Sequence, residues 1–513
     1  MLDLHINHID LSGNWTWSGK RWTCRESFIE PFDHPALTAS CEPLPEADGG
    51  GWTFTVRERR DTVNAISGEF CRVAATAQYV TITAGSWGTA PLFILERDQC
   101  LFGSWDLTRL PLRGSPLNER EAARLLTMRF RYTAETLFTG LLRLTERATI
   151  RSDFTGTPLV VYPEPAQHWA PRELAPEADV VAGYETVLDQ VLAEYSFIPD
   201  MTAAQVSGGL DSANIALSLG SRPGGRTIVP GAVVVGGRRG ELQAERRRLL
   251  IDRAGFAVPD EQVTASAHLP FCPEGARAGG ERLSPYDEQY EEALTTLHRR
   301  FADRGARYVF TGVGGDEMVA LNRTEITAQP VGSDRVFMPW LTAKTCQAAQ
   351  HSDEGLAPTS AINEMSLIAM GYSAPSLLKA GLWPYHPFTH PRLIRFGEWL
   401  PEEWRRNKRL PRERLTRRGL PDRVTHPKVT ESFAETMDLA LVRYGVPLLR
   451  RLLSDGFRLV DEGLIDPDRL TDACDRIEAG TPWPRNRQRE VFDALAVEHA
   501  IRTLTDDPAL TLR

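Results

Sequence analysis

Two loops in this chain combine glycines with hydroxyls and a carboxylate, the residue types that surround a phosphate and its metal ion. They are residues 207–212 (SGGLDS) and 311–317 (TGVGGDE). Glycines let the backbone fold tightly around an anion, and free N–H groups and hydroxyls can bind it. Asp211 and Asp316 fit beside phosphates only if a cation such as Mg²⁺ lies between them. The two loops therefore predict a metal–triphosphate site.

The sequence around each loop predicts the elements that would position it. Apolar residues 203–206 indicate a strand before the first loop, and residues 213–217 indicate a helix after it. Residues 306–310 likewise predict a buried strand before the second loop. Binding loops gather at the carboxyl ends of parallel strands, so both loops can face one site. Residues 227–235 (TIVPGAVVV) predict a third strand, whose end at Val235 could carry an adenine on its backbone.

The first loop has two other interpretations, a capped turn and a mononucleotide P-loop. A Ser-Gly-Gly-x-Asp-Ser string is also compatible with an ordinary turn capped by Asp and Ser, but the second strand–glycine–acid motif argues against that. The mononucleotide P-loop, G-x-x-x-x-G-K-[ST], does not occur in the sequence. Residues 13–20 come nearest to it, but they are one residue too long and Arg21 follows.

The paired motifs resemble the synthetase domain of the asparagine synthetase family, which belongs to the pyrophosphatase-loop ATPases. The resemblance covers roughly residues 180–440 well and the first 165 weakly. It implies that ATP activates a carboxylate as an acyl-adenylate and that an amine then displaces AMP to form an amide. It also implies a nucleotide site at Ser207, Gly208, Gly209, Asp211, Ser212, Val235, Gly312 and Gly314, with Asp211 and Asp316 as magnesium ligands.

The source of the amine follows from the start of the chain. The family's glutaminase domain uses a cysteine at position two as nucleophile, with its own α-amine as base. This chain has Leu2 there, and its first cysteine is Cys24. We therefore expect a remnant first domain without glutaminase activity. The amine would come from the substrate itself or from a second amine-bearing substrate, as in β-lactam synthetases and lasso-peptide macrolactam synthetases.

Two further residues are predicted to be catalytic from the resemblance. Residues 363–366 (NEMS) resemble the segment that supplies the glutamate of the Tyr–Glu dyad in β-lactam synthetases, which makes Glu364 the candidate base. It is equally an ordinary glutamate in the first turn of a helix. The dyad tyrosine would fall at Val313, which cannot move protons, so either Glu364 acts alone or another residue supplies the function of the phenol. Residues 420–428 resemble a family run whose lysine contacts the acyl-phosphate and the developing oxyanion, and that lysine is Lys428 here.

Composition is ordinary for a globular protein of two or three domains. The 513 residues are 42% hydrophobic and 25% charged, with a formal net charge of −9. We expect no nucleic-acid partner, because no sustained basic face is evident and the basic run 405–418 reads as a solvated or substrate-facing helix. Seven scattered cysteines predict neither a disulfide framework nor a zinc site. The absence of a signal peptide or long apolar stretch predicts a cytoplasmic protein without a membrane partner.

Together these features predict an α/β fold in which a parallel-sheet pyrophosphatase-loop synthetase domain follows a degenerate, antiparallel β-rich domain similar to Ntn hydrolases. The expected boundaries are 1–165 for the first domain, 166–180 for a linker, and 181–513 for the synthetase domain with a helical C-terminal part. The expected activity is ATP- and Mg²⁺-dependent, AMP-forming amide ligation, intramolecular and lactam-forming, on a small molecule or peptide that bears a carboxylate and an amine. The alternatives are a macrolactam synthetase acting on a precursor peptide, and a silent homologue that binds nucleotide or a partner. A homodimer is compatible with any of these.

Overall fold

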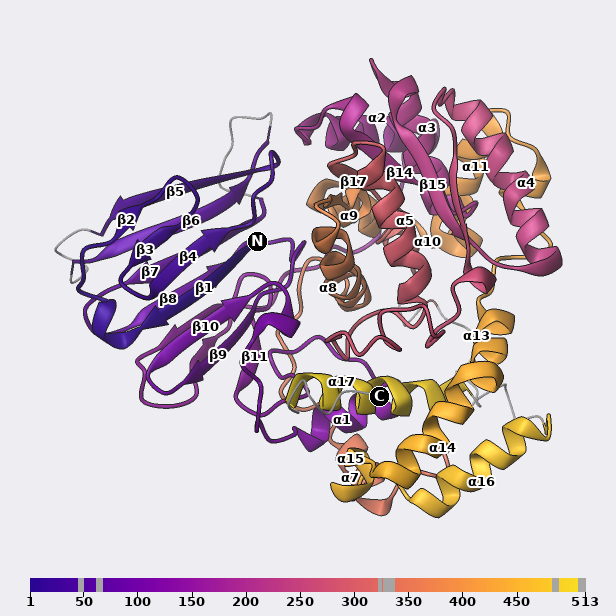
Figure 1. Ribbon diagram of the computed structural model, residues 1–513. Helices are drawn as coiled ribbons and strands as arrows, with labels where there is room; N and C mark the ends of the chain where they lie inside the picture. The colour runs from indigo at the N-terminus through magenta and orange to yellow at the C-terminus, as the bar shows by residue number, and fades with distance from the viewer. Residues whose placement is uncertain (45–49, 61–67, 322–324, 326–336, 482–488, 506–513) are drawn as a thin grey trace.

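The protein has an antiparallel β-rich N-terminal region, a parallel five-stranded sheet flanked by helices, and a helical C-terminal part (Figure 1). The computed structural model describes residues 1–44, 50–60, 68–321, 325, 337–481 and 489–505. The α/β architecture expected from the sequence is therefore present: antiparallel strands come first and the parallel sheet comes later.

Two antiparallel sheets form the N-terminal region. In spatial order the first comprises β11 (Leu141–Arg143), β9 (Phe93–Arg97), β10 (Cys100–Ser104), β1 (Leu2–Asn7), β4 (Ser27–Pro31), β3 (Trp22–Cys24) and β2 (Thr16–Trp17). The second comprises β13 (Leu159–Val161), β12 (Thr149–Ser152), β8 (Val80–Ala84), β7 (Phe70–Ala75), β6 (Trp52–Glu58) and β5 (Leu37–Pro43). Alternate residues of β1 and β6 are buried, so each sheet turns one face to a shared core. Leu2 is a fully buried member of that core.

The parallel sheet has the spatial order β16 (Glu261–Thr264), β15 (Val229–Val234), β14 (Thr202–Gln205), β17 (Tyr308–Phe310) and β18 (Trp383–Tyr385). The strands β15, β17 and β18 are buried along their whole length, as expected for strands covered on both faces. The chain runs outward from β14 to β16 and then returns to β17 on the other side of β14. This reversal places the loops after β14 and β17 side by side at the carboxyl edge, where ligands bind in open α/β sheets.

Helices cover both faces of the parallel sheet. On one face, the helices α2 (Val180–Glu194), α3 (Leu210–Gly220), α4 (Gly237–Ala254), α9 (Pro391–Trp399) and α11 (Arg409–Arg417) pack against one another and the sheet. On the other, α5 (Glu291–Asp303) and α8 (Glu364–Lys379) bury Leu297, Phe301 and Leu377 against the strands. The short helices α6 (Gly315–Met318), α10 (Glu402–Arg405) and α12 (Asp422–Thr425) lie close to the carboxyl edge of the sheet.

The helical C-terminal part shares its core with helices from earlier in the chain. It contains α13 (Ala434–Ala440), α14 (Val446–Asp455), α15 (Arg458–Asp461), α16 (Pro467–Glu478) and α17 (Val491–Thr505). Their apolar side chains pack with those of α1 (Glu119–Leu126). The helix α7 (Ala343–Gln350) lies beside α15 (Figure 1). Leu125 of α1 and Leu495 of α17 belong to one buried cluster.

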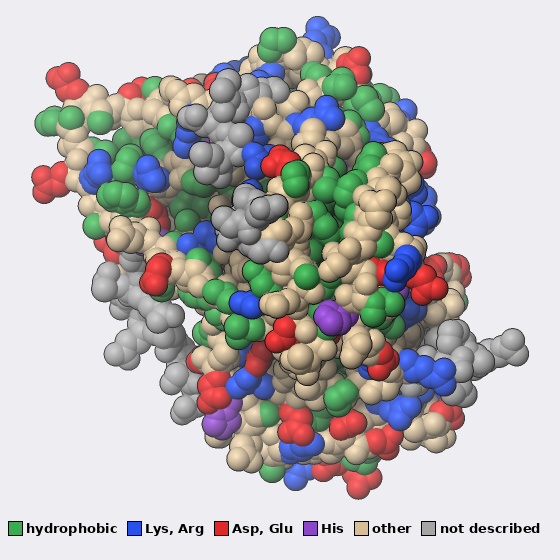
Figure 2. Space-filling view, turned by 90° about the vertical axis from the view of Figure 1, so that its left-hand side faces the viewer, with side chains coloured by type: hydrophobic (Ala, Val, Ile, Leu, Met, Phe, Trp, Pro, Cys, Tyr) green, Lys and Arg blue, Asp and Glu red, His purple; other side chains and the backbone are tan. Residues whose placement is uncertain are grey.

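The β-rich region and the parallel sheet are also in direct contact. His34 Nε2 lies 2.8 Å from the carbonyl oxygen of Arg307, and the Trp383 indole donates to Glu58 Oε2 at 3.1 Å. Residues 162–179, which connect the two, contain neither helix nor strand. On the face that Figure 2 shows, acidic and basic side chains are interspersed and form no patch of one sign. No helix in the described part of the chain has both the length and the apolar character needed to cross a bilayer.

Candidate functional site

The first loop turns its donors toward the carboxyl edge of the parallel sheet. Gly208 has φ +95°, a conformation that favours glycine, and Gly209 precedes α3 without a side-chain cap. The N–H groups of the first turn of α3 are therefore free to bind an anion. The Oγ atoms of Ser207 and Ser212 lie 3.0 Å apart, so the two hydroxyls sit together in the loop. This arrangement can bind a phosphate.

A glutamine from α4 holds the first loop against the neighbouring strand. Gln243 Nε2 donates to the carbonyl oxygens of Ser207 at 2.8 Å and Val233 at 3.2 Å, and its Oε1 accepts from the N–H of Val235 at 2.9 Å. The residue is 2% exposed. Val235, the predicted adenine position, thus already uses its N–H inside the protein. Sequence reasoning missed Gln243, because a single glutamine in a helix rich in charged residues carries no local signal of this role.

The second loop approaches the first so closely that only glycine fits. A Cβ on Gly312 would lie 2.8 Å from the backbone nitrogen of Ser212. One on Gly315 would lie 2.5 Å from Cγ of Asp211. Gly314 has φ +91° and precedes α6, which carries Asp316 in its first turn. The structure therefore brings together the two motifs that the sequence predicted to share a site.

Asp211 and Asp316 share one cation, the ammonium of Lys408. Lys408 Nζ lies 2.8 Å from Asp211 Oδ2 and also contacts Asp316 Oδ1. Burial raises the pKa of Asp211, and Lys408 opposes that shift. For Lys408, burial lowers the pKa but the two carboxylates outweigh it, so the net shift is upward. Lys408 lies in the basic run 405–418, which the sequence indicated only as a solvated or substrate-facing helix.

The donor set suits a magnesium ion that arrives with its nucleotide. Two carboxylates that can contact one cation, together with phosphate oxygens and water, match the way Mg²⁺ binds in nucleotide enzymes. The described residues contain no group of three or more His, Cys, Asp and Glu side chains that could hold a metal by themselves. A cation held by both carboxylates would lie where the Lys408 ammonium lies in this structure.

Lys428 lies on a segment that runs along the first loop. Its neighbour Val429 accepts a hydrogen bond from Arg246 of α4 at 3.1 Å, and Glu431 forms an ion pair with the same arginine at 2.7 Å. Glu431 Oε1 lies 3.1 Å from the position that a Cβ on Gly208 would take. The side chain of Lys428 is exposed and pairs with no residue that the structure describes. The segment is thus beside the loop, and the ammonium is free to meet a ligand.

Glu364 is the first residue of α8, close to the second loop. Asn363 and Ser366 on either side of it line a cavity of about 330 Å³ that Gly314 and Glu317 also line. Glu364 itself is exposed and does not line this cavity. The start of α8 therefore borders the space next to the second loop, and the Glu364 side chain is open to solvent in the part of the chain that the structure describes.

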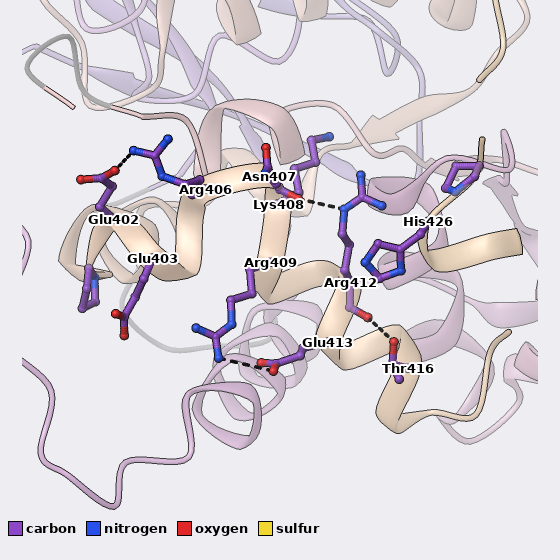
Figure 3. A pocket seen from close by; sticks show the side chains of 12 residues that line it. Glu402, Glu403, Arg406, Asn407, Lys408, Arg409, Arg412, Glu413, Thr416 and His426 are labelled. Atoms are coloured by element: carbon purple, nitrogen blue, oxygen red, sulfur yellow. Dashed lines mark hydrogen bonds and ion pairs between the residues drawn. The ribbon is translucent and has the colours of Figure 1, made fainter. Parts of the chain in front are cut away.

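A large charged groove is lined by Lys408 (Figure 3), the residue that pairs with Asp211. It has a volume of about 1330 Å³ and is formed by residues of α10, α11 and the start of segment 426–431. Its acids and bases pair locally: Arg406 with Glu402, and Arg409 with Glu413 at 3.6 Å. Arg412 donates to the carbonyl oxygen of Asn407 at 2.8 Å. Lys408 is thus the lining cation that faces the two loop carboxylates.

Comparisons with family models and with curated proteins identify no relative of this chain: no family model matches it, and no curated protein matches it.

Proposed function

We propose that this protein is an ATP- and Mg²⁺-dependent ligase that adenylates a carboxylate, couples it to an amine and releases AMP and pyrophosphate, as in the asparagine synthetase family. The observation that carries the proposal is the contact of one ammonium with both Asp211 and Asp316. Two acids from adjacent strand ends that share a cation next to uncapped helix N–H groups are suited to a metal-bound triphosphate.

The residues of the two loops would divide the work of the first half-reaction. The N–H groups at the start of α3 and the hydroxyls of Ser207 and Ser212 would hold the phosphates that leave as pyrophosphate. A bound Mg²⁺ would neutralise phosphate charge between Asp211 and Asp316. The Lys408 ammonium contacts both carboxylates in this structure. When the metal ion binds there, the ammonium would turn from the carboxylates to the phosphates.

The second half-reaction needs a proton acceptor and a positive charge near the acyl carbon. Glu364 remains our candidate for the acceptor and Lys428 for the charge, on the resemblance of their segments. Glu364 is exposed, so bound substrate must cover it before it can act as a base. Val313, at the position of the dyad tyrosine, supplies no hydroxyl. The proton of the amine would thus go to Glu364 directly.

The first domain would be a remnant of the family's glutaminase domain, without glutaminase activity. Its residue two, Leu2, is buried in the sheet core and carries no nucleophile. The attacking amine would then belong to a substrate, either on the molecule whose carboxylate is activated or on a second one.

A peptide substrate is the second candidate within the same chemistry. The groove of about 1330 Å³ that Lys408 lines is larger than a site for a single amino acid needs, and it is lined by charged side chains. This favours a macrolactam synthetase acting on a precursor peptide. The silent homologue would show neither reaction.

The experiment is a product analysis of the purified protein with Mg²⁺-ATP and sets of amino acids, short peptides and precursor-like peptides. We expect AMP and pyrophosphate in equal amounts, and pyrophosphate exchange into ATP when only the acid substrate is present. Formation of ADP and phosphate would contradict the proposal. The Asp211→Asn variant is the control, since it should lose both signals while remaining folded. A set of peptides that stimulates AMP release where amino acids do not would favour the macrolactam candidate.

A further inference from the structure

A second cavity lies away from the two loops, between α8, α17 and the segment 285–290. Its volume is about 300 Å³. Met365, Ile368, Ala369 and Tyr372 line it from α8, and their spacing of three and four residues puts them on one face of that helix. Phe130, Tyr290 and Val497 add further apolar and aromatic surface. A largely apolar enclosure of this size is suited to a small organic molecule.

Three carboxylates line this cavity, and among the described residues that line it there is no Lys, Arg or His. Asp287 Oδ2 accepts a hydrogen bond from the Ser284 N–H at 3.0 Å. Asp493 is 8% exposed: its Oδ1 accepts from Gln289 Nε2 at 2.7 Å, but its Oδ2 has no partner in the described part of the chain. Glu288 forms no hydrogen bond or ion pair through its carboxylate with any described residue.

The nearest basic side chains are engaged elsewhere. Arg277 donates to the backbone carbonyls of Glu288 at 2.7 Å and Gln289 at 3.1 Å, and its Nε lies 3.3 Å from Glu292. Lys379 Nζ lies 3.5 Å from Asp106. Neither cation forms an ion pair with the acids of the cavity, although Lys379 and Arg277 oppose the burial that raises the pKa of Asp287 to about 6. The Oδ2 atom of Asp493 is thus buried without a partner in the described part of the chain, which is costly for the ionised form.

We propose that this cavity binds an organic cation, a primary ammonium on a small apolar or aromatic body. The ammonium would pair with Asp493 Oδ2 and Glu288, and the body would lie against the aromatic side chains of Phe130, Tyr290 and Tyr372. The site needs no nucleotide and does not depend on the proposed ligase activity.

The protonation of the acids gives the proposal a second signature. Burial raises the pKa of Asp493 to about 8, and the Gln289 hydrogen bond opposes the shift while Glu490 adds to it. Burial and the neighbouring Asp287 raise the pKa of Glu288, whereas Arg277 lowers it. Among the lining residues, α8 adds only the phenol of Tyr372 as a titratable group, and residues 125–130 add none. A bound ammonium favours the ionised acids, so binding should release protons and strengthen as the pH rises from about 6 to about 8.

Calorimetry without ATP tests this with phenethylamine as the probe and two matched controls, the neutral 2-phenylethanol and the anionic phenylacetate. We expect the amine to bind and the alcohol and the anion not to bind. Proton release should appear as a binding enthalpy that depends on the ionisation enthalpy of the buffer. Binding of the alcohol as tight as that of the amine, or of none of the three, would overturn the proposal.

Variants separate the site from other acidic surfaces. Asp493→Asn keeps the acceptor for Gln289 and removes the charge, so it should weaken amine binding about tenfold or more. Asp472→Asn, at an exposed acid of α16, is the matched control and should bind as the wild type does. Ala496→Leu fills the cavity from α17 without changing charge and should also abolish binding. If a folded Ala496→Leu variant bound the amine normally, the cavity would not be the site.

Discussion

Gly315→Ala tests whether the two loops really depend on their close approach. An alanine Cβ at this position would lie 2.5 Å from Cγ, 2.6 Å from Cβ and 2.7 Å from Oδ1 of Asp211. Carbon atoms in contact prefer about 3.5–4.0 Å, so the carboxylate or α6 must move by about 1 Å. The substitution changes no charge and no hydrogen-bonding group.

The cost to the fold should be small and the cost to the reaction large. Overpacking costs about 1–3 kcal/mol, and the helix preference of alanine over glycine returns up to about 1 kcal/mol. The free energy of unfolding should therefore fall by at most about 3 kcal/mol. A 1 Å displacement in a catalytic arrangement can cost about a hundredfold in rate, and we expect that loss in pyrophosphate exchange.

Gly371→Ala is the matched control, because a Cβ on this glycine of α8 meets no atom within 4 Å. It should stabilise the protein by about 0.5–1 kcal/mol and leave exchange unchanged. Denaturation curves and exchange rates of both variants give the comparison. If Gly315→Ala exchanged pyrophosphate at the wild-type rate, the position of Asp211 would not matter for the reaction and the reasoning would be wrong.

Three further predictions concern the remaining residues. Glu364→Gln should still exchange pyrophosphate while product forms at least tens of times more slowly, because a general base acts only on the attacking amine. Lys428→Met should slow both exchange and product formation, because the ammonium acts in both half-reactions. Equal product rates for Glu364→Gln and wild type would show that another group is the base. Glutamine should not be hydrolysed with or without ATP, and steady glutamate production would overturn the remnant assignment. Burial, aided by Glu58, raises the pKa of Glu69 to about 8. The folded state thus holds a proton that the unfolded state loses near pH 4.5, so the free energy of unfolding should fall as the pH rises from about 4.5 to about 8. Denaturation curves at pH 5, 7 and 9 should show a smaller pH dependence of this free energy for Glu69→Gln than for wild type. The same pH dependence in both proteins would refute the assigned role of Glu69.

The loops could be predicted from the sequence because their signals are local. Apolar runs before SGGLDS and TGVGGDE indicated strands, and the structure has β14 and β17 there, side by side. The rule that parallel strands carry ligands at their carboxyl ends then brought Asp211 and Asp316 together. The alternating segments near residues 52 and 80 likewise indicated the antiparallel strands β6 and β8.

The partners of the loops could not be predicted, because distant segments supply them. Lys408 and Asn407 both adopt positive φ, which no local pattern demands and which tertiary contacts must maintain. Gln243 binds three backbone groups, in the first loop and at the end of β15, and a single glutamine in a helix does not signal that. The packing of α1 with the C-terminal helices also joins segments far apart in the sequence. In each case only the folded chain brings the groups together.

Calorimetric binding of a hydrolysis-resistant ATP analogue, with and without Mg²⁺, tests the paired-loop site most directly, because it needs no knowledge of the substrate. We predict that the wild-type protein binds the analogue only with Mg²⁺, and that Asp211→Asn and Asp316→Asn each weaken the Mg²⁺-dependent binding at least tenfold, as expected for loss of a charged ligand. If the wild type did not bind the analogue, or if both variants bound it with Mg²⁺ as tightly as the wild type, the two acids would not form a metal–triphosphate site.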